Sequence, residues 1–194
     1  MKRASTLQGM LHKLTIVNVV ATSELRQPVD LGRLVRVSGF LYDQAIYPCA
    51  YLKDSRTKAK VSIFSSGKMI CAGAKSYGDA KHDLRYAAKR LAELRIVEPT
   101  RIIVKLQNIV ATGELAQPVD IEWLAAKLPS VIYEPEQFPG AIYYAKELEG
   151  ASILIFSSGK LVFAGLRSLE MLEESTRVLR DLAEITSVQR DAAL

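Results

Sequence analysis

The residues of this 194-residue chain that could do chemistry come in pairs about 90 positions apart. An asparagine, a phenylalanine and a lysine each recur in the same order, as Asn18 and Asn108, Phe64 and Phe156, and Lys68 and Lys160. Amide donors, aromatic rings and ammonium groups suit binding to a polar, anionic ligand better than they suit bond-breaking chemistry.

The side chains typical of enzymes are sparse. The two histidines, His12 and His82, have no nearby cysteine or carboxylate cluster with metal-ligand spacing. The Ser-Gly-Lys segments are not phosphate-binding P-loops, because no glycine stands five residues before Gly67 or Gly159. We therefore expect no enzyme activity, no cofactor and no metal.

The pairs belong to an internal repeat. Nine of eleven positions of 20–30 are identical in 110–120, and Ile-Phe-Ser-Ser-Gly-Lys of 63–68 recurs unchanged in 155–160. A period near 90 residues is too long for a solenoid unit and indicates a duplicated αβ module.

Each module reads as strands followed by a covering helix, which is an α+β arrangement. In the first copy, residues 14–21 alternate as a strand, and Asp30 is expected to cap a short helix to about Phe40. After two β-rich stretches, Ser76 and Asp79 form a capping box for a longer helix. The second copy is expected to end in a helix from about 168 to 185.

Strand alternation separates two faces. Val17, Val19 and Ala21 share one side of the first strand, and Asn18 and Val20 lie on the other. If the helices cover the Val17 side, the opposite face is apolar, carries Asn and Lys, and is expected to have no carboxylate. Such a face suits the minor groove of A·T-rich DNA, which presents only acceptors. A face buried in a sandwich or a dimer is the alternative.

Charge is distributed unevenly. Residues 1–97 carry 17 Lys and Arg against 7 Asp and Glu, whereas residues 98–194 carry 9 against 14. This asymmetry indicates a polyanion partner on one side and a protein partner on the other, although oppositely charged solvated faces would also produce it. The basic segment from Lys75 to Arg95 is either a solvated helix face or a dock for regulators or flanking DNA.

Several segments in duplicate, in this order and spacing, resemble the TATA-box-binding protein family, in its archaeal form. They are Val17–Ala21, Ile63–Met69, Ala72–Ser76, Gln107–Val110 and Tyr133–Gly140. The resemblance covers roughly residues 11–186. It implies two tandem pseudo-symmetric repeats, 11–97 and 101–186, forming a saddle, a curved ten-stranded antiparallel sheet with four helices on its convex face. Residues 1–10 and 187–194 are then expected to be flexible termini.

The resemblance also assigns roles to residues. Asn18 and Asn108 match the central asparagines that donate to base acceptors, and Phe64, Phe156, Phe138 and Tyr47 match aromatic wedges at the two ends. The full set implied to contact DNA is Asn18, Val20, Tyr47, Phe64, Ser66, Lys68, Ile70, Ala72, Asn108, Val110, Phe138, Phe156, Ser158, Lys160, Val162 and Ala164. Glu134 and Glu136 match the loop that binds the transcription factor B type of initiation factor.

Some positions depart from the family pattern. Tyr47 stands where the family usually has Phe, and Pro48-Cys49 follows it instead of Pro-Gly. Ala72 and Ala164 replace a threonine, and Tyr144 stands where an arginine is common. Each lost hydrogen bond would weaken binding by ~1 kcal/mol.

The sequence therefore predicts a general transcription initiation factor that binds and bends A·T-rich double-stranded promoter DNA. It would recruit a transcription factor B type partner, and RNA polymerase indirectly. The expected location is the archaeal cytoplasm with the nucleoid, or the nucleus in a eukaryote, without a membrane, because every apolar run is shorter than ~20 residues. The alternatives are a protein-interaction scaffold with weakened DNA binding and a homodimer off DNA; on DNA we expect a monomer.

Overall fold

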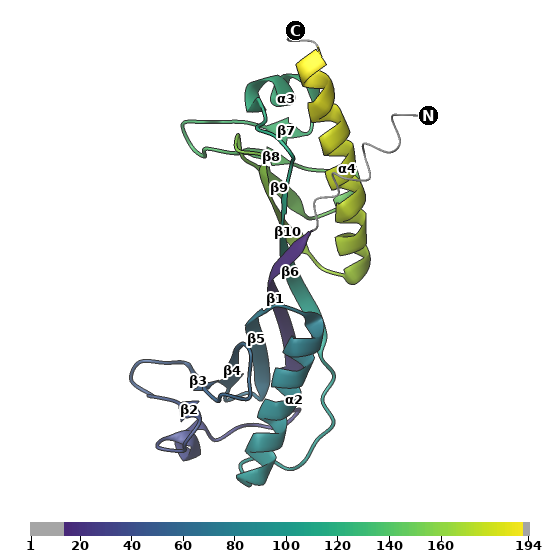
Figure 1. The fold of residues 1–194 in the computed structure, drawn as a ribbon. Helices are drawn as coiled ribbons and strands as arrows, with labels where there is room; N and C mark the ends of the chain where they lie inside the picture. Colours follow the sequence, from purple (N-terminus) through teal and green to yellow (C-terminus); the bar gives the residue numbers. More distant parts are fainter. Residues whose placement is uncertain (1–13, 192–194) are drawn as a thin grey trace. The chain divides into compact units, whose positions relative to one another are not determined.

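The computed structural model describes residues 14–191, with side chains to residue 187. The ten strands and the helices are divided between two repeats of similar order, and the second repeat has an additional 3-10 helix, η2 (Figure 1). The first repeat comprises β1 (Thr15–Glu24), η1 (Leu31–Leu34), β2 (Phe40–Leu41), β3 (Cys49–Leu52), β4 (Lys60–Phe64), β5 (Lys68–Ala74) and α2 (Tyr77–Glu93). The second comprises β6 (Lys105–Glu114), α3 (Ile121–Lys127), β7 (Val131–Ile132), β8 (Ala141–Tyr143), η2 (Lys146–Leu148), β9 (Ser152–Ile155), β10 (Lys160–Leu166) and α4 (Leu169–Asp191).

The strands are ordered β2-β3-β4-β5-β1-β6-β10-β9-β8-β7 in a ten-stranded sheet. Within each repeat, all neighbouring strands pair antiparallel. The expected fold class, two αβ repeats contributing to a ten-stranded antiparallel sheet, is confirmed. The chain divides into two compact units, one of them Val17–Asn108 and the other including everything from Ile109 onward.

The number of helices was predicted wrongly. Among the described residues there are three α-helices, because the first short helix, expected to reach about Phe40, is a 3-10 helix of four residues. Gly32 lies in its first turn, and Arg36 has a positive φ of 66°, which stops helical winding. The matching segment of the second repeat, Ile-Glu-Trp-Leu-Ala-Ala-Lys, has no glycine and forms the seven-residue helix α3.

The caps of these helices are confirmed. Asp30 Oδ1 accepts from the Gly32 amide at 3.0 Å, and its counterpart Asp120 Oδ1 accepts from the Trp123 amide at 3.0 Å. The Ser76 hydroxyl accepts from the Asp79 amide at 3.0 Å and donates to the Asp79 carboxylate at 2.8 Å. These bonds satisfy backbone donors that the first helical turn leaves unpaired.

Each long helix covers one side of its own repeat's strands. In the first repeat, α2 packs on β4 and β5 and buries Leu84, Ala87 and Leu91. In the second, α4 packs on β10 and η2 and buries Val178, Leu179 and Leu182. Helix α4 continues to Asp191, past the expected end near Ile185; residues 1–10 and 192–194 of the expected flexible termini lie outside the described residues. Within the described residues, no helix combines the length and apolarity needed to cross a membrane.

Candidate nucleic-acid interface

In the part of the chain that the structure describes, each repeat has one strand face that its long helix, α2 or α4, does not cover. On β1, Val19 and Ala21 are fully buried, whereas Asn18 and Val20, on either side of Val19, are half-buried. The same alternation places Ile70, Ala72, Val110, Val162 and Ala164 on the less buried side of β5, β6 and β10. We name these half-exposed positions the open face of each repeat. Side chains of this kind remain available to a ligand.

The strand register lines up equivalent rows on the two open faces. In the first repeat Thr22 lies opposite Ile70, which lies opposite Ser62, and Tyr51 continues the row on β3. In the second repeat the corresponding row is Thr112, Val162, Leu154 and Ile142. The row is more polar in the first repeat, although the backbone pattern is the same.

Asn18 is oriented by the backbone of β5. Its side-chain oxygen accepts a hydrogen bond from the Gly73 amide at 2.8 Å, and Gly73 lies at an irregularity in the β1–β5 pairing with φ of 97°. Because the oxygen is held by this N–H donor, the other end of the amide is the NH₂ group. A fixed NH₂ donor on an apolar face matches a ligand surface that offers acceptors.

Both Ser-Gly-Lys turns are anchored to the Gln-Pro segment of their own repeat. A Cβ on Gly67 would lie 2.2 Å from the Gln27 carbonyl oxygen, and one on Gly159 would lie 2.6 Å from that of Gln117. Both glycines also have φ near 90°, so only glycine fits. The two best-preserved motifs of the repeat therefore pack on each other, and the turns present four exposed side chains, those of Ser66, Lys68, Ser158 and Lys160.

One expectation about this face was wrong. Strands β1 and β6 run on to Glu24 and Glu114, which share the parity of the open face and lie opposite Lys68 and Lys160. The face is therefore not free of carboxylates, although both glutamates are exposed and stand at strand ends beside a lysine. The prediction failed because the strand was expected to end at Ala21, three residues too early.

The aromatic residues at the ends of the two repeats are arranged differently. Phe138 and Phe156 form an edge-to-face pair with ring centroids 5.8 Å apart and planes at 64°. In the first repeat Tyr47 pairs instead with Tyr51, at 5.4 Å and 80°. The Lys60 ammonium lies 3.7 Å from the centroid of the Tyr51 ring, which is a cation–π contact.

Tyr51 and Lys60 were missed in the sequence, although a signal was present. Lys60 lies on the same side of β4 as Ser62 and Phe64, and Tyr51 of β3 pairs with Ser62. The repeat offset aligns Tyr51 and Lys60 with Ile142 and Ser152 of the second copy. With Tyr47 and Lys53 they line a groove of about 840 Å³ that reaches Ala72 and Gly73. Contact with the Cys49 thiol raises the pKa of the Tyr51 phenol.

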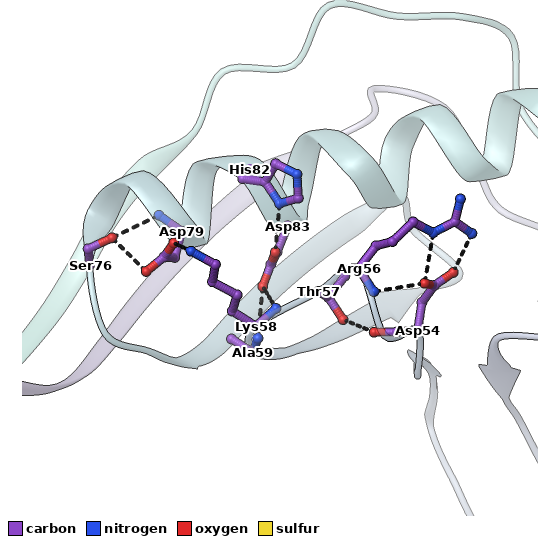
Figure 2. A network of polar contacts seen from close by, with 9 residues as sticks. All are labelled: Asp54, Arg56, Thr57, Lys58, Ala59, Ser76, Asp79, His82 and Asp83. Atoms are coloured by element: carbon purple, nitrogen blue, oxygen red, sulfur yellow. Dashed lines mark hydrogen bonds and ion pairs between the residues drawn. The ribbon is translucent and has the colours of Figure 1, made fainter.

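The loop between β3 and β4 is held on α2 by polar contacts (Figure 2). The Asp83 carboxylate, which is fully buried, accepts from the backbone amides of Lys58 and Ala59 at 2.9 and 2.8 Å. Lys58 Nζ donates to Asp79 at 2.6 Å. At the other end of the loop Asp54 accepts two hydrogen bonds from the Arg56 side chain, which hold the pKa of that carboxyl well below its usual range.

The acidic loop of the second repeat lies between β7 and β8. Glu134 and Glu136 are both exposed, and Glu134 accepts a hydrogen bond from the Gln137 side chain at 2.6 Å. The Phe138 amide donates to the Glu134 carbonyl at 3.0 Å, so the loop that carries the acids also positions the aromatic ring.

The side chains that could bind metals or undergo redox chemistry were located in the part of the chain that the structure describes. There, no three His, Cys, Asp or Glu side chains gather as metal ligands. Cys49 and Cys71 are free thiols, and both are buried.

Comparison with known proteins agrees with this geometry. The family model described as transcription factor TFIID (or TATA-binding protein, TBP) matches residues 13–94 and again 103–185. The TATA-box-binding protein of Cenarchaeum symbiosum is 36% identical over 163 residues, 83% of this chain and 88% of its own, and that of Pyrococcus horikoshii is 32% identical over 181 residues, 92% and 94%. The solved structure of Methanococcus jannaschii TBP superposes with a TM-score of 0.75 at 31% identity, covering 89% of this chain and 98% of the other. With two matched repeats and relatives above 30% identity over most of its length, the chain belongs to the TATA-box-binding protein family, whose members are DNA-binding transcription factors.

Proposed function

We propose that this protein is a general transcription initiation factor that binds A·T-rich promoter DNA of the TATA-box type through the open faces of its two repeats. The observation that carries the proposal is the Asn18 amide, whose oxygen accepts from the Gly73 N–H, so that its NH₂ group is the end left for a ligand at an apolar face. The minor groove of A·T pairs offers only acceptors, so fixed donors among apolar side chains complement it. The names of the relatives support the same ligand.

The other open-face residues take parts that their chemistry allows. Asn108 would donate to base acceptors as Asn18 does, and Val20, Ile70, Ala72, Val110, Val162 and Ala164 would pack along the groove floor. Lys68 and Lys160, with Ser66 and Ser158, would contact phosphates, since they are exposed at tight turns. The rings of Tyr47, Phe64, Phe138 and Phe156 would lie at the two ends of the bound DNA segment, where any ring that enters a base step bends the duplex.

A protein partner would bind the second repeat. Glu134 and Glu136 are exposed on one loop of the acidic half of the chain, so they suit a basic surface on a transcription factor B type partner. Such a partner would bring RNA polymerase to the promoter indirectly. Reversing the charge of Glu136, as Glu136→Arg, should weaken factor capture on DNA, and a titration of the same variant onto the duplex without the factor measures any effect on DNA binding itself.

The test is a titration of the protein onto a short duplex containing a TATA-type box, against a scrambled duplex of equal composition. Dyes on the two ends report the bend by energy transfer, and the titration is repeated at two salt concentrations. We expect preferential, salt-sensitive binding that draws the ends together. Equal binding to both duplexes, without bending, would refute promoter recognition.

Two lysine substitutions, one in the proposed interface and one outside it, make this test more specific. Lys160→Ala should lower the slope of log affinity against log salt by about 1, as expected for one lost phosphate contact. Lys127→Ala, in α3 of the same repeat, removes an exposed lysine that lies over the Trp123 ring and should leave the slope unchanged. Equal slopes for the two variants would show that Lys160 does not contact a phosphate.

A second candidate function is a scaffold that binds transcription partners and has little affinity for DNA. Its support is the altered end of the first repeat, where Tyr47 and Cys49 replace the Phe and Gly present in the second. This candidate expects the partner factor to bind the acidic loop equally well with and without DNA. Partner binding that requires the TATA duplex would exclude it.

A further inference from the structure

The ring pair of the second repeat exists because residue 140 is glycine. A Cβ built there would lie 2.9 Å from Phe138 Cε1, 3.3 Å from Phe156 Cδ1 and 3.0 Å from the Ile155 carbonyl oxygen. Any side chain at this position would therefore push into the space that the two phenylalanine rings share. The buried backbone at Gly140 is what allows Phe138 and Phe156 to pack edge to face.

The equivalent position of the first repeat is filled. Tyr47-Pro48-Cys49 aligns with Phe138-Pro139-Gly140, and Cys49 pairs directly across from Phe64 on β4. Its side chain is buried, with 3% of its surface exposed, so it occupies the room that the glycine leaves open in the second repeat. Tyr47 accordingly packs on Tyr51, and Phe64 lies beside the thiol-bearing residue instead of a second ring.

At two positions of this region the first repeat has lysines, Lys53 and Lys60, where the second has Tyr144 and Ser152. Lys60 lies over the Tyr51 ring, and its counterpart in the second repeat is Ser152. Lys53 and Lys60 are exposed along the same groove as Tyr47 and Tyr51, and the one carboxylate there, Asp54, is already paired with Arg56. The chemistry of this groove therefore fits a phosphate backbone better than the interior of a base stack.

We propose that the two repeats act differently on DNA: the Phe138–Phe156 pair of the second repeat unstacks a base step, whereas the first repeat clamps the backbone through the Tyr47–Tyr51–Lys60 cluster and inserts no ring. This inference rests on the proposed function and assigns the kink to one end of the box. A braced pair of apolar rings can enter a stack without losing hydrogen bonds, while the Tyr47 hydroxyl would have to leave water.

The experiment uses 2-aminopurine, a base analogue that brightens when it is unstacked, placed at either end of the TATA-type box in two separate duplexes. With the wild-type protein bound, the fluorescence of 2-aminopurine should rise in at least one of the two duplexes. Phe156→Ala should abolish this rise in every duplex that shows it. Phe64→Ala, the matched variant in the first repeat, should leave the brightening unchanged. Because the comparison is between variants, it holds even if the protein binds the box in both orientations.

Two further variants keep the proposal falsifiable. Lys60→Ala should flatten the salt dependence of binding and leave the brightening unchanged, whereas Tyr47→Phe combined with Cys49→Gly should create brightening at the second end. Loss of brightening in Phe64→Ala would overturn the inference and leave the proposed function standing. Binding without brightening at either end would also overturn it, and absence of preferential binding to the box would refute the proposed function itself.

Discussion

Asp83 is expected to be the polar side chain on which the first repeat depends most for stability. It is fully buried, its Oδ2 accepts from the Lys58 and Ala59 amides at 2.9 and 2.8 Å, and its Oδ1 contacts His82 Nδ1 at 3.0 Å (Figure 2). Asp83→Ala would leave two backbone donors of the β3–β4 loop without their acceptor. Hydrogen bonds to charged groups contribute about 1.5–3 kcal/mol each, and partial exposure of the loop favours the low end, so the loss is ~3 kcal/mol.

The repeat supplies the matched control. Ser175 stands 92 positions after Asp83 and is equally buried, but its hydroxyl donates to the Met171 carbonyl within its own helix at 2.7 Å. Ser175→Ala loses one local bond and gains helix propensity, so its net effect should be under about 1 kcal/mol.

The assay is thermal unfolding followed by far-UV circular dichroism. For a chain of this size, ~3 kcal/mol corresponds to a fall in Tm of about 6–12 °C for Asp83→Ala. Asp83→Asn, which retains one acceptor oxygen, should fall between that variant and the wild type. If Asp83→Ala lowers Tm no more than Ser175→Ala does, the buried carboxylate does not hold the loop and the reasoning from its hydrogen bonds is refuted.

Three other perturbations have defined outcomes. Gly140→Cys should separate Phe138 from its ring partner at an overpacking cost of ~1–3 kcal/mol, and should weaken binding to the TATA duplex; unchanged affinity would show that the ring pair is dispensable. The Lys58 hydrogen bond lowers the pKa of Asp79, so the stability that this contact adds is complete above the unfolded-state pKa of about 4 and is lost as pH falls through the lower folded-state pKa. As the pH is lowered from 5, the unfolding midpoint of Lys58→Ala should therefore fall less than that of the wild type. Parallel plots of midpoint against pH for the two proteins would contradict this. Burial, reinforced by nearby acidic charges, raises the pKa of the Cys71 thiol to about 12, so it should resist a thiol reagent at pH 8 until the protein is unfolded, and equal labelling of folded and unfolded protein would disprove it.

The features predictable from sequence were those that repeat or alternate. Period-two alternation on β1 identified the half-exposed side of Asn18, and the duplicated motifs identified two equivalent modules. The length of the first short helix could not be predicted in this way, because an N-cap such as Asp30 fixes where a helix begins and not where it ends. What decided the length was a glycine in the first turn and a left-handed Arg36, neither of which a cap signal registers.

The roles within the site were only partly predictable, for a physical reason. Aligning Tyr47 with Phe138 suggests two equivalent wedges, since a tyrosine ring differs from phenylalanine by one hydroxyl. The larger difference lies two residues away, where Cys49 occupies the space that Gly140 leaves empty, and that space is visible only once the strands are paired. A single buried Cβ thereby sets which rings are neighbours: Phe138 packs on Phe156 in the second repeat, whereas Tyr47 packs on Tyr51, the ring that Lys60 contacts, in the first. The sequence shows the aromatic residues but not these ring partners.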